Sequence, residues 1–141
     1  MKKILVLAAV IALVSSTAFA AGTATLTVTA NVQGTCLITG GTLPFGLIDS
    51  IAAPAVGPIA AAGVTVTCNS GTIYSVTDDA GANPLNNGAG DTIPFTLAHA
   101  GGGTATGLAD AYAITGSIAA GTYAGLPAGA YTSSVTLTVT P

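Results

Sequence analysis

The chain is almost devoid of positive charge. It contains no arginine, and its two lysines, Lys2 and Lys3, stand at its beginning. After them, the strongly charged side chains are five aspartates. A basic surface for nucleic acid or anionic lipid is therefore excluded. So few charges in so apolar a chain also make a free subunit prone to association.

Histidine is equally scarce, and this removes most catalytic chemistry. His99, the single histidine, lies in a glycine-rich stretch without an acidic neighbour, so we interpret it as an exposed loop residue and not as a general base. Asp78 and Asp79 lack the spacing of a calcium loop and are typical of a turn. The glycine run at 101–103 has no following lysine to bind phosphate. The sequence predicts no enzyme, no cofactor and no metal site.

Residues 1–20 are predicted to be a secretory signal peptide. A basic start precedes an apolar run (4–14), and a small-x-small tripeptide ends at Ala20, so we expect cleavage between Ala20 and Ala21. The apolar run is shorter than the roughly 20 residues that a membrane span requires. No membrane span is therefore expected after signal removal, and the remainder suits one secreted domain.

The chain has two cysteines, Cys36 and Cys68. Export favours a disulfide between them, because oxidising compartments preserve such bonds. Closing a loop of roughly 30 residues would stabilise the fold by about 3–4 kcal/mol. Free thiols or a metal pair are the alternatives, although a single histidine and the lack of a C-x-x-C motif disfavour metal.

Strict alternation of apolar and polar residues opens the predicted secreted chain. Between residues 24 and 32 it places Leu26, Val28, Ala30 and Val32 on one face and threonine or asparagine on the other. This period of two predicts a β-strand with one buried face. No hairpin turn joins it to the next strand. The pattern alone leaves open whether it pairs within its own subunit or with a neighbour.

The rest of the chain also predicts strands, separated by dense turn signals. The clearest is the closing strand, 131–140, whose expected inward face includes Tyr131, Val135, Leu137 and Val139. No helical periodicity is present, so the sequence predicts an all-β sandwich of one domain. The other expected strands cover 64–68, 72–76, 93–97 and 111–115.

Four motifs follow one another along this pattern. They are the first strand with Gly34-Thr35-Cys36, the run Leu43-Pro44-Phe45-Gly46, the stretch 64–71 around Cys68, and a closing part at 114–118 and 129–139. In this order they resemble the spore coat protein U family, which includes the major subunits of archaic chaperone–usher pili. Ser133 departs from the family pattern, which has aspartate there.

The resemblance implies an incomplete immunoglobulin-like sandwich that is completed by a donated N-terminal strand. It implies a signal peptide (1–20), a donor-strand extension (21–35) and a pilin-like sandwich domain (36–141). The apolar face of the extension, Leu26 to Val32, would enter an apolar groove beside the closing strand of the next subunit, which is a form of β-augmentation.

The resemblance also implies function and partners. It predicts a structural subunit of an extracellular fimbrium, exported through the periplasm, with a role in surface adhesion or biofilm. The expected partners are other copies in a head-to-tail filament, a periplasmic chaperone and an outer-membrane usher. The alternative is a self-contained secreted binding module with the first strand paired in cis, or a coat or matrix protein.

Overall fold

The computed structural model describes residues 22–141, so the predicted signal peptide and its cleavage site at Ala20 and Ala21 lie outside the described residues. Regular structure in the described part consists of short β-strands and one 3₁₀ turn, η1 (Ala80–Ala82). No helix among these residues is long and apolar enough to cross a membrane. Residues 32–141 form one compact unit, and residues 22–31 belong to a separate unit.

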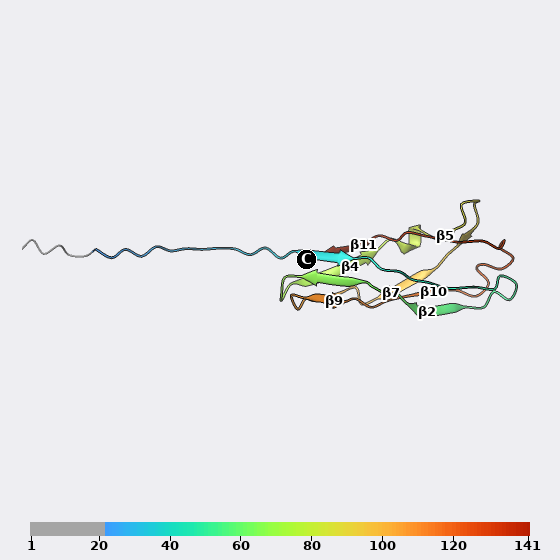
Figure 1. Ribbon diagram of the computed structural model, residues 1–141, viewed down its shortest axis with the longest axis horizontal. Coiled ribbons are helices and arrows are strands. Elements are labelled where there is room, and N and C mark those ends of the chain that lie inside the picture. The colour runs from blue at the N-terminus through green and yellow to red at the C-terminus, as the bar shows by residue number, and fades with distance from the viewer. Residues whose placement is uncertain (1–21) are drawn as a thin grey trace, which may run out of the picture. The chain divides into compact units, whose positions relative to one another are not determined.

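Several small antiparallel sheets build the compact unit as an incomplete immunoglobulin-like sandwich (Figure 1). One sheet has the order β1 (Cys36–Thr39), β3 (Thr65–Cys68), β9 (Ala109–Ala111). A second has the order β2 (Val56–Ala60), β10 (Ile114–Ile118), β7 (Thr96–His99). The third has the order β11 (Leu137–Thr140), β4 (Ile73–Asp78), β8 (Gly102–Thr104), and β5 (Leu85–Asn86) pairs with β6 (Thr92–Ile93).

Two adjoining clusters of buried side chains form the core. The first gathers around Val66, Val76 and Ile114 beside the disulfide, and the second around Ile118 and Tyr123. Every second residue of β10 is buried, as the period of two requires. The buried Tyr123 donates its hydroxyl to the carbonyl of Pro54 at 2.6 Å, so its polar group is satisfied.

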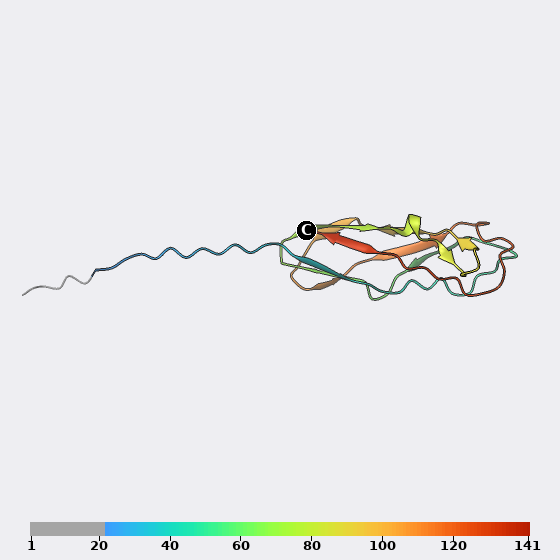
Figure 2. The ribbon, with the colours of Figure 1, turned by 90° about the horizontal axis from the view of Figure 1, so that it is seen from above.

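The compact unit has two ends, the disulfide end and the distal end. At the disulfide end, Cys36 and Cys68 are bonded at 2.05 Å. The Thr35 backbone N–H there donates to Asn69 Oδ1 at 2.8 Å. The distal end consists of loops 46–52 and 119–130, where the Gly125 N–H donates to the Ser50 carbonyl at 2.9 Å. Figure 2 shows β11 (red) running toward the end at which β1 begins, the disulfide end.

The structure confirms the all-β fold and shortens several expected strands. The closing strand pairs with β4 only over Leu137–Thr140, and an isolated bridge joins Thr132 to Asn86. Pro94 divides the expected strand 93–97 into the end of β6 and the start of β7, because proline has no N–H for the ladder. β2 forms outside the expected strands.

Candidate functional site

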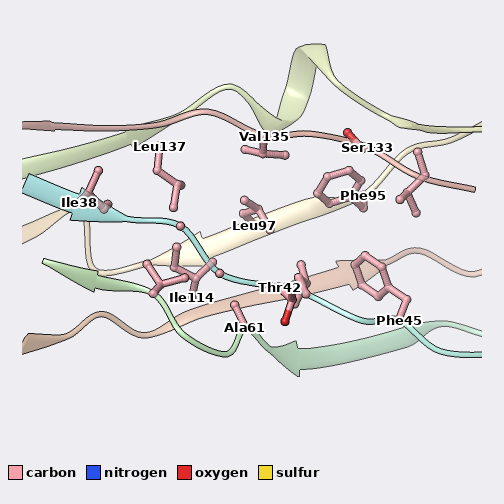
Figure 3. A pocket seen from close by; sticks show the side chains of 15 residues that line it. Ile38, Thr42, Phe45, Ala61, Phe95, Leu97, Ile114, Ser133, Val135 and Leu137 are labelled. Carbon is pink, nitrogen blue, oxygen red and sulfur yellow. The ribbon is translucent and has the colours of Figure 1, made fainter.

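An apolar groove lies between β11 and the chain that follows β1 (Figure 3). β1 and β11 are both edge strands of their sheets, so each has a backbone edge without a ladder partner in the part of the chain that is described. The groove has a volume of about 270 Å³ and lies mainly between the chain that leads into β11 and the chain that leaves β1. Its walls are Ser133, Val135 and Leu137 on one side and Ile38, Leu43 and Phe45 on the other, above a floor that includes Phe95, Leu97 and Ile114.

The alternation predicted for the closing strand is present in the structure. Tyr131, Val135, Leu137 and Val139 are half-buried, as is Ser133, and the alternate residues at 132, 134, 136 and 138 are exposed. Val135 and Leu137 line the groove, whereas Val139 packs on the first core cluster. Tyr131 lies farther along, toward the distal end. The four residues therefore share one face, but only two of them border the groove itself.

A second cavity continues the apolar lining toward the distal end. It has a volume of about 570 Å³ and shares Leu43, Phe45 and Leu85 with the groove. Tyr131 lines it and donates its hydroxyl to the Pro127 carbonyl at 3.1 Å. Together the two cavities give an apolar path along residues 131–137.

Residues 133–136, which precede β11, are held by side-chain hydrogen bonds and not by a ladder with β4. The Thr136 N–H donates to Asp79 Oδ1 at 2.7 Å, and the Ser133 hydroxyl donates to the Asn83 carbonyl at 2.6 Å. Asp79 and Asn83 flank η1, which follows β4 directly. Residues 133–136 are thus fastened on the same side on which β11 pairs with β4.

This fastening leaves the other backbone edge of the segment free. In an extended strand, successive residues turn their N–H and C=O groups to opposite edges. Because the Thr136 N–H points to Asp79, the backbone groups of Val135 and Leu137 point toward the groove. The groove therefore offers both an apolar floor and a set of backbone donors and acceptors, which is what an added β-strand requires.

The hydrogen bond from Thr136 also lowers the pKa of Asp79 from its ordinary value of 3.8, because the N–H stabilises the ionised carboxylate. Sequence reasoning placed Asp78 and Asp79 in a turn, and Asp78 does accept the Ala80 N–H at 2.9 Å. It missed the contact of Asp79 with Thr136, which lies 57 residues away. No local sequence motif predicts a contact over such a separation.

The walls opposite β11 were also only partly anticipated. Phe45 stacks edge-on against Phe95, with ring centroids 5.8 Å apart. Gly46 has a φ of 72°, a backbone conformation that favours glycine. The contribution of Phe45 to the groove wall was not foreseen, although the Leu-Pro-Phe-Gly motif marks the place.

The segment with the strict alternation carries no strand in the structure. Residues 22–34 form neither helix nor strand. The side chains of Leu26, Val28 and Val32 are 84%, 82% and 81% exposed, and Ala30 is exposed as well. A row of apolar side chains at a spacing of two therefore remains uncovered.

The interpretation of His99 as an exposed loop residue was wrong. His99 ends β7, and its side chain is only 11% exposed. Its Nε2 lies 3.0 Å from Asp78 Oδ2 and its Nδ1 lies 3.0 Å from the Tyr112 hydroxyl. Asp78 is 21 residues away, so tertiary folding supplies the acidic neighbour that the local sequence lacks. Burial raises the pKa of Tyr112.

Nothing in this cluster faces the groove or assembles a metal site. Within residues 22–141, no group of three or more histidine, cysteine or acidic side chains is placed to hold a metal ion. The two sulfurs of Cys36 and Cys68 form the predicted disulfide, which rules out the alternatives of free thiols and a metal pair.

The structure is thus a β-sandwich with an apolar groove between two strand edges that have no ladder partner in the described part of the chain. Proteins of this class have a sandwich that lacks a strand on one side. The family model for the Spore Coat Protein U domain matches residues 22–97, more than half of the chain. The chain therefore belongs to the spore coat protein U family, and with it to structural surface proteins of the fimbrial and coat type. A search of curated proteins finds no match.

Proposed function

We propose that this chain is a structural subunit of an extracellular pilus that is assembled by donor-strand exchange. The observation that carries the proposal is the apolar groove beside the free edge of Val135 and Leu137. The exposed alternating segment 24–32 provides the complementary strand. Insertion would satisfy backbone groups on both partners and cover apolar side chains on both.

The dimensions and energetics of the segment are suitable. Nine extended residues span about 30 Å at ~3.3 Å per residue, which is enough to cross a sandwich. Burying Leu26, Val28 and Val32 would contribute roughly 1.5–3 kcal/mol for each side chain. Because these side chains start above 80% exposed, nearly all of that burial is available to the complex.

Chain connectivity favours insertion into a neighbour. All ladder pairings in the compact unit are antiparallel. β11 runs toward the disulfide end, so an antiparallel donor would finish with Val32 near the distal end. Its own β1 begins at Cys36, at the disulfide end, and four peptide steps reach at most about 14 Å. An antiparallel donor therefore cannot fill its own groove, and a head-to-tail contact of this kind does not close, which gives a fibre.

The remaining features of the proposal follow from the open groove. A free subunit would expose the apolar floor of the groove and would aggregate. We therefore propose that a periplasmic chaperone covers the groove before assembly and that an outer-membrane usher catalyses strand exchange. Surface adhesion and biofilm formation are the proposed roles of the finished filament. The family supports self-assembly of this kind.

Paired charge variants test the donor strand. Leu26→Asp with Val28→Asp places carboxylates on the apolar face, and we expect loss of the heat-sensitive ladder that pilus fragments give in detergent gels. Thr27→Asp with Thr29→Asp adds the same charge to the polar face and should preserve the ladder. Equal laddering of the two variants would refute the donor role.

A fused donor tests the groove. The chain ends at the disulfide end, so a second copy of residues 24–32, attached through a short turn after Pro141, would enter antiparallel to β11. In a chain that lacks residues 22–33, this fusion should give a stable monomer by light scattering. A fused copy that carries Leu26→Asp and Val28→Asp should not give a stable monomer. If the unmodified chain is already a stable monomer without a fusion, the first strand pairs in cis and runs parallel to β11, and the pilus proposal is wrong.

A further inference from the structure

Each end of the compact unit carries large apolar side chains that lie outside the core and outside the groove, and those at the distal end border the second cavity. At the distal end, the side chains of Leu47 and Ile51 are 106% and 95% exposed. At the disulfide end, Leu37 and Leu108 are 65% and 71% exposed. Gly107, which precedes Leu108, lies against Ser70, and this fixes the Leu108 turn beside the end of β3.

The length of the linker determines which surfaces come together in a filament. This step rests on the proposed function. An antiparallel donor strand leaves its neighbour's groove at the distal end with Val32, and the donor's own domain begins four residues later at Cys36. At most about 14 Å of chain separates these two positions. The disulfide end of one subunit therefore lies directly against the distal end of the next.

We propose that consecutive subunits form a second contact, in which the loop carrying Leu47 and Ile51 packs onto Leu37 and Leu108 of the donor subunit. Charge supports an apolar contact, because residues 22–141 contain no lysine or arginine and ion pairs of basic side chains across the junction are impossible. The carboxylates at the two ends are engaged locally. Asp49 accepts the Ile51 N–H at 2.8 Å, and Asp110 accepts the Thr106 hydroxyl at 2.9 Å.

Such a contact fixes the angle between consecutive domains. The donor strand already raises the local concentration of the two ends, so a small apolar surface is sufficient to associate. Without the contact, residues 33–35 would act as a hinge. With it, the junction is held at two separate points, and the filament is stiffer than its linker alone would make it.

Crosslinking of intact filaments tests the contact. A chain with Ile51→Cys and Leu108→Cys should form a covalent ladder with a short bis-maleimide reagent, and this ladder should persist after boiling in detergent. Each single variant should give dimers at most. A control pair, Thr77→Cys with Leu108→Cys, moves the first cysteine to an exposed position on β4, outside the distal loops, and should give no ladder.

A second measurement uses no cysteine and guards against mispairing with the native disulfide. Leu37→Ser with Leu108→Ser, which alters neither the groove nor the second cavity, should lower the persistence length of filaments in electron micrographs at least twofold, while the boiling-sensitive ladder stays unchanged. Filaments with unaltered stiffness and no covalent ladder would overturn the second contact and leave donor-strand exchange intact. Failure of the unmodified chain to form any filament would overturn both.

Discussion

The Asp79 side chain makes a hydrogen bond to the backbone that a neighbouring strand would otherwise make. Its carboxylate accepts the N–H of Thr136 at 2.7 Å, at a point where the ladder with β4 has already ended. Because the folded-state pKa lies below the ordinary 3.8, the carboxylate contributes stability above the unfolded pKa. That contribution is lost as the pH falls through the lower, folded value.

We therefore expect Asp79→Asn to lower the stability of the subunit at pH 7, and to lower it progressively less as the pH falls below 3.8 and through the depressed folded-state pKa of Asp79. The physical reason is that the wild-type carboxylate becomes protonated over this range and loses its advantage over the amide. Thermal unfolding followed by circular dichroism across this pH range measures the difference. Asp110→Asn, which alters a carboxylate far from Thr136, should retain the wild-type acid dependence. A constant difference between wild type and Asp79→Asn at all pH values would contradict the account.

Gly116 makes the groove wall possible by having no side chain. It lies in β10 beneath the walls, and an added Cβ would collide with Leu43 Cδ2 and would lie 3.0 Å from Phe45 Cζ. Gly116→Ala should destabilise the subunit by about 1–3 kcal/mol, because the core there is overpacked. Urea titration measures the effect. Gly129→Ala is the matched control, because open space surrounds Gly129 and its change should stay within about 0.5 kcal/mol.

At the scale of elements, β1 depends on the disulfide. β1 is a four-residue edge strand that pairs only with β3, and its register places Cys36 opposite Cys68. Replacing both cysteines by serine should cost about 3–4 kcal/mol, because the unfolded chain regains the freedom of a loop of roughly 30 residues. Denaturant unfolding of the two proteins measures this loss. Equal midpoints would show that the strand needs no covalent support.

The elements also mark where sequence reasoning succeeded and where it stopped. The alternation around Val64–Cys68 and at residues 137–140 predicted strands correctly, because a period of two is a local property. It overextended the closing strand, because residues 133–136 alternate equally well but face Asp79 and Asn83 in place of a strand. His99 was misjudged for the same reason, since its partners are Asp78 in β4 and Tyr112 in the segment between β9 and β10.

At the scale of the whole molecule, donor and acceptor functions should be separable. A subunit with Leu26→Asp and Val28→Asp can accept but not donate, and one with Val135→Asp can donate but not accept. Each alone should remain monomeric, and a mixture should stop at a one-to-one dimer, because only one productive contact remains. Light scattering of the mixture measures this outcome. Thr138→Asp, on the exposed face of β11, is the control for added charge and should still polymerise.

Growth of the mixture beyond a dimer would contradict a single donor and a single groove per subunit. The sequence pattern identified the buried face of the first strand but could not say whose core it enters. That answer depends on the direction of β11 and on the four steps from Val32 to Cys36, and the direction of β11 is a property of the folded topology.

The position of the disulfide has a mechanical consequence. In a filament joined by donated strands, tension would pass from one groove through residues 33–35 and enter the next domain at Cys36. That residue is the one bonded covalently to β3, so the pull is transferred at once to the interior of a sheet. An edge strand held by hydrogen bonds alone would peel away residue by residue. The bond to Cys68 instead anchors the strand at the point where the force arrives, and the donated strand must then slide lengthwise against β11, with its hydrogen bonds strained together.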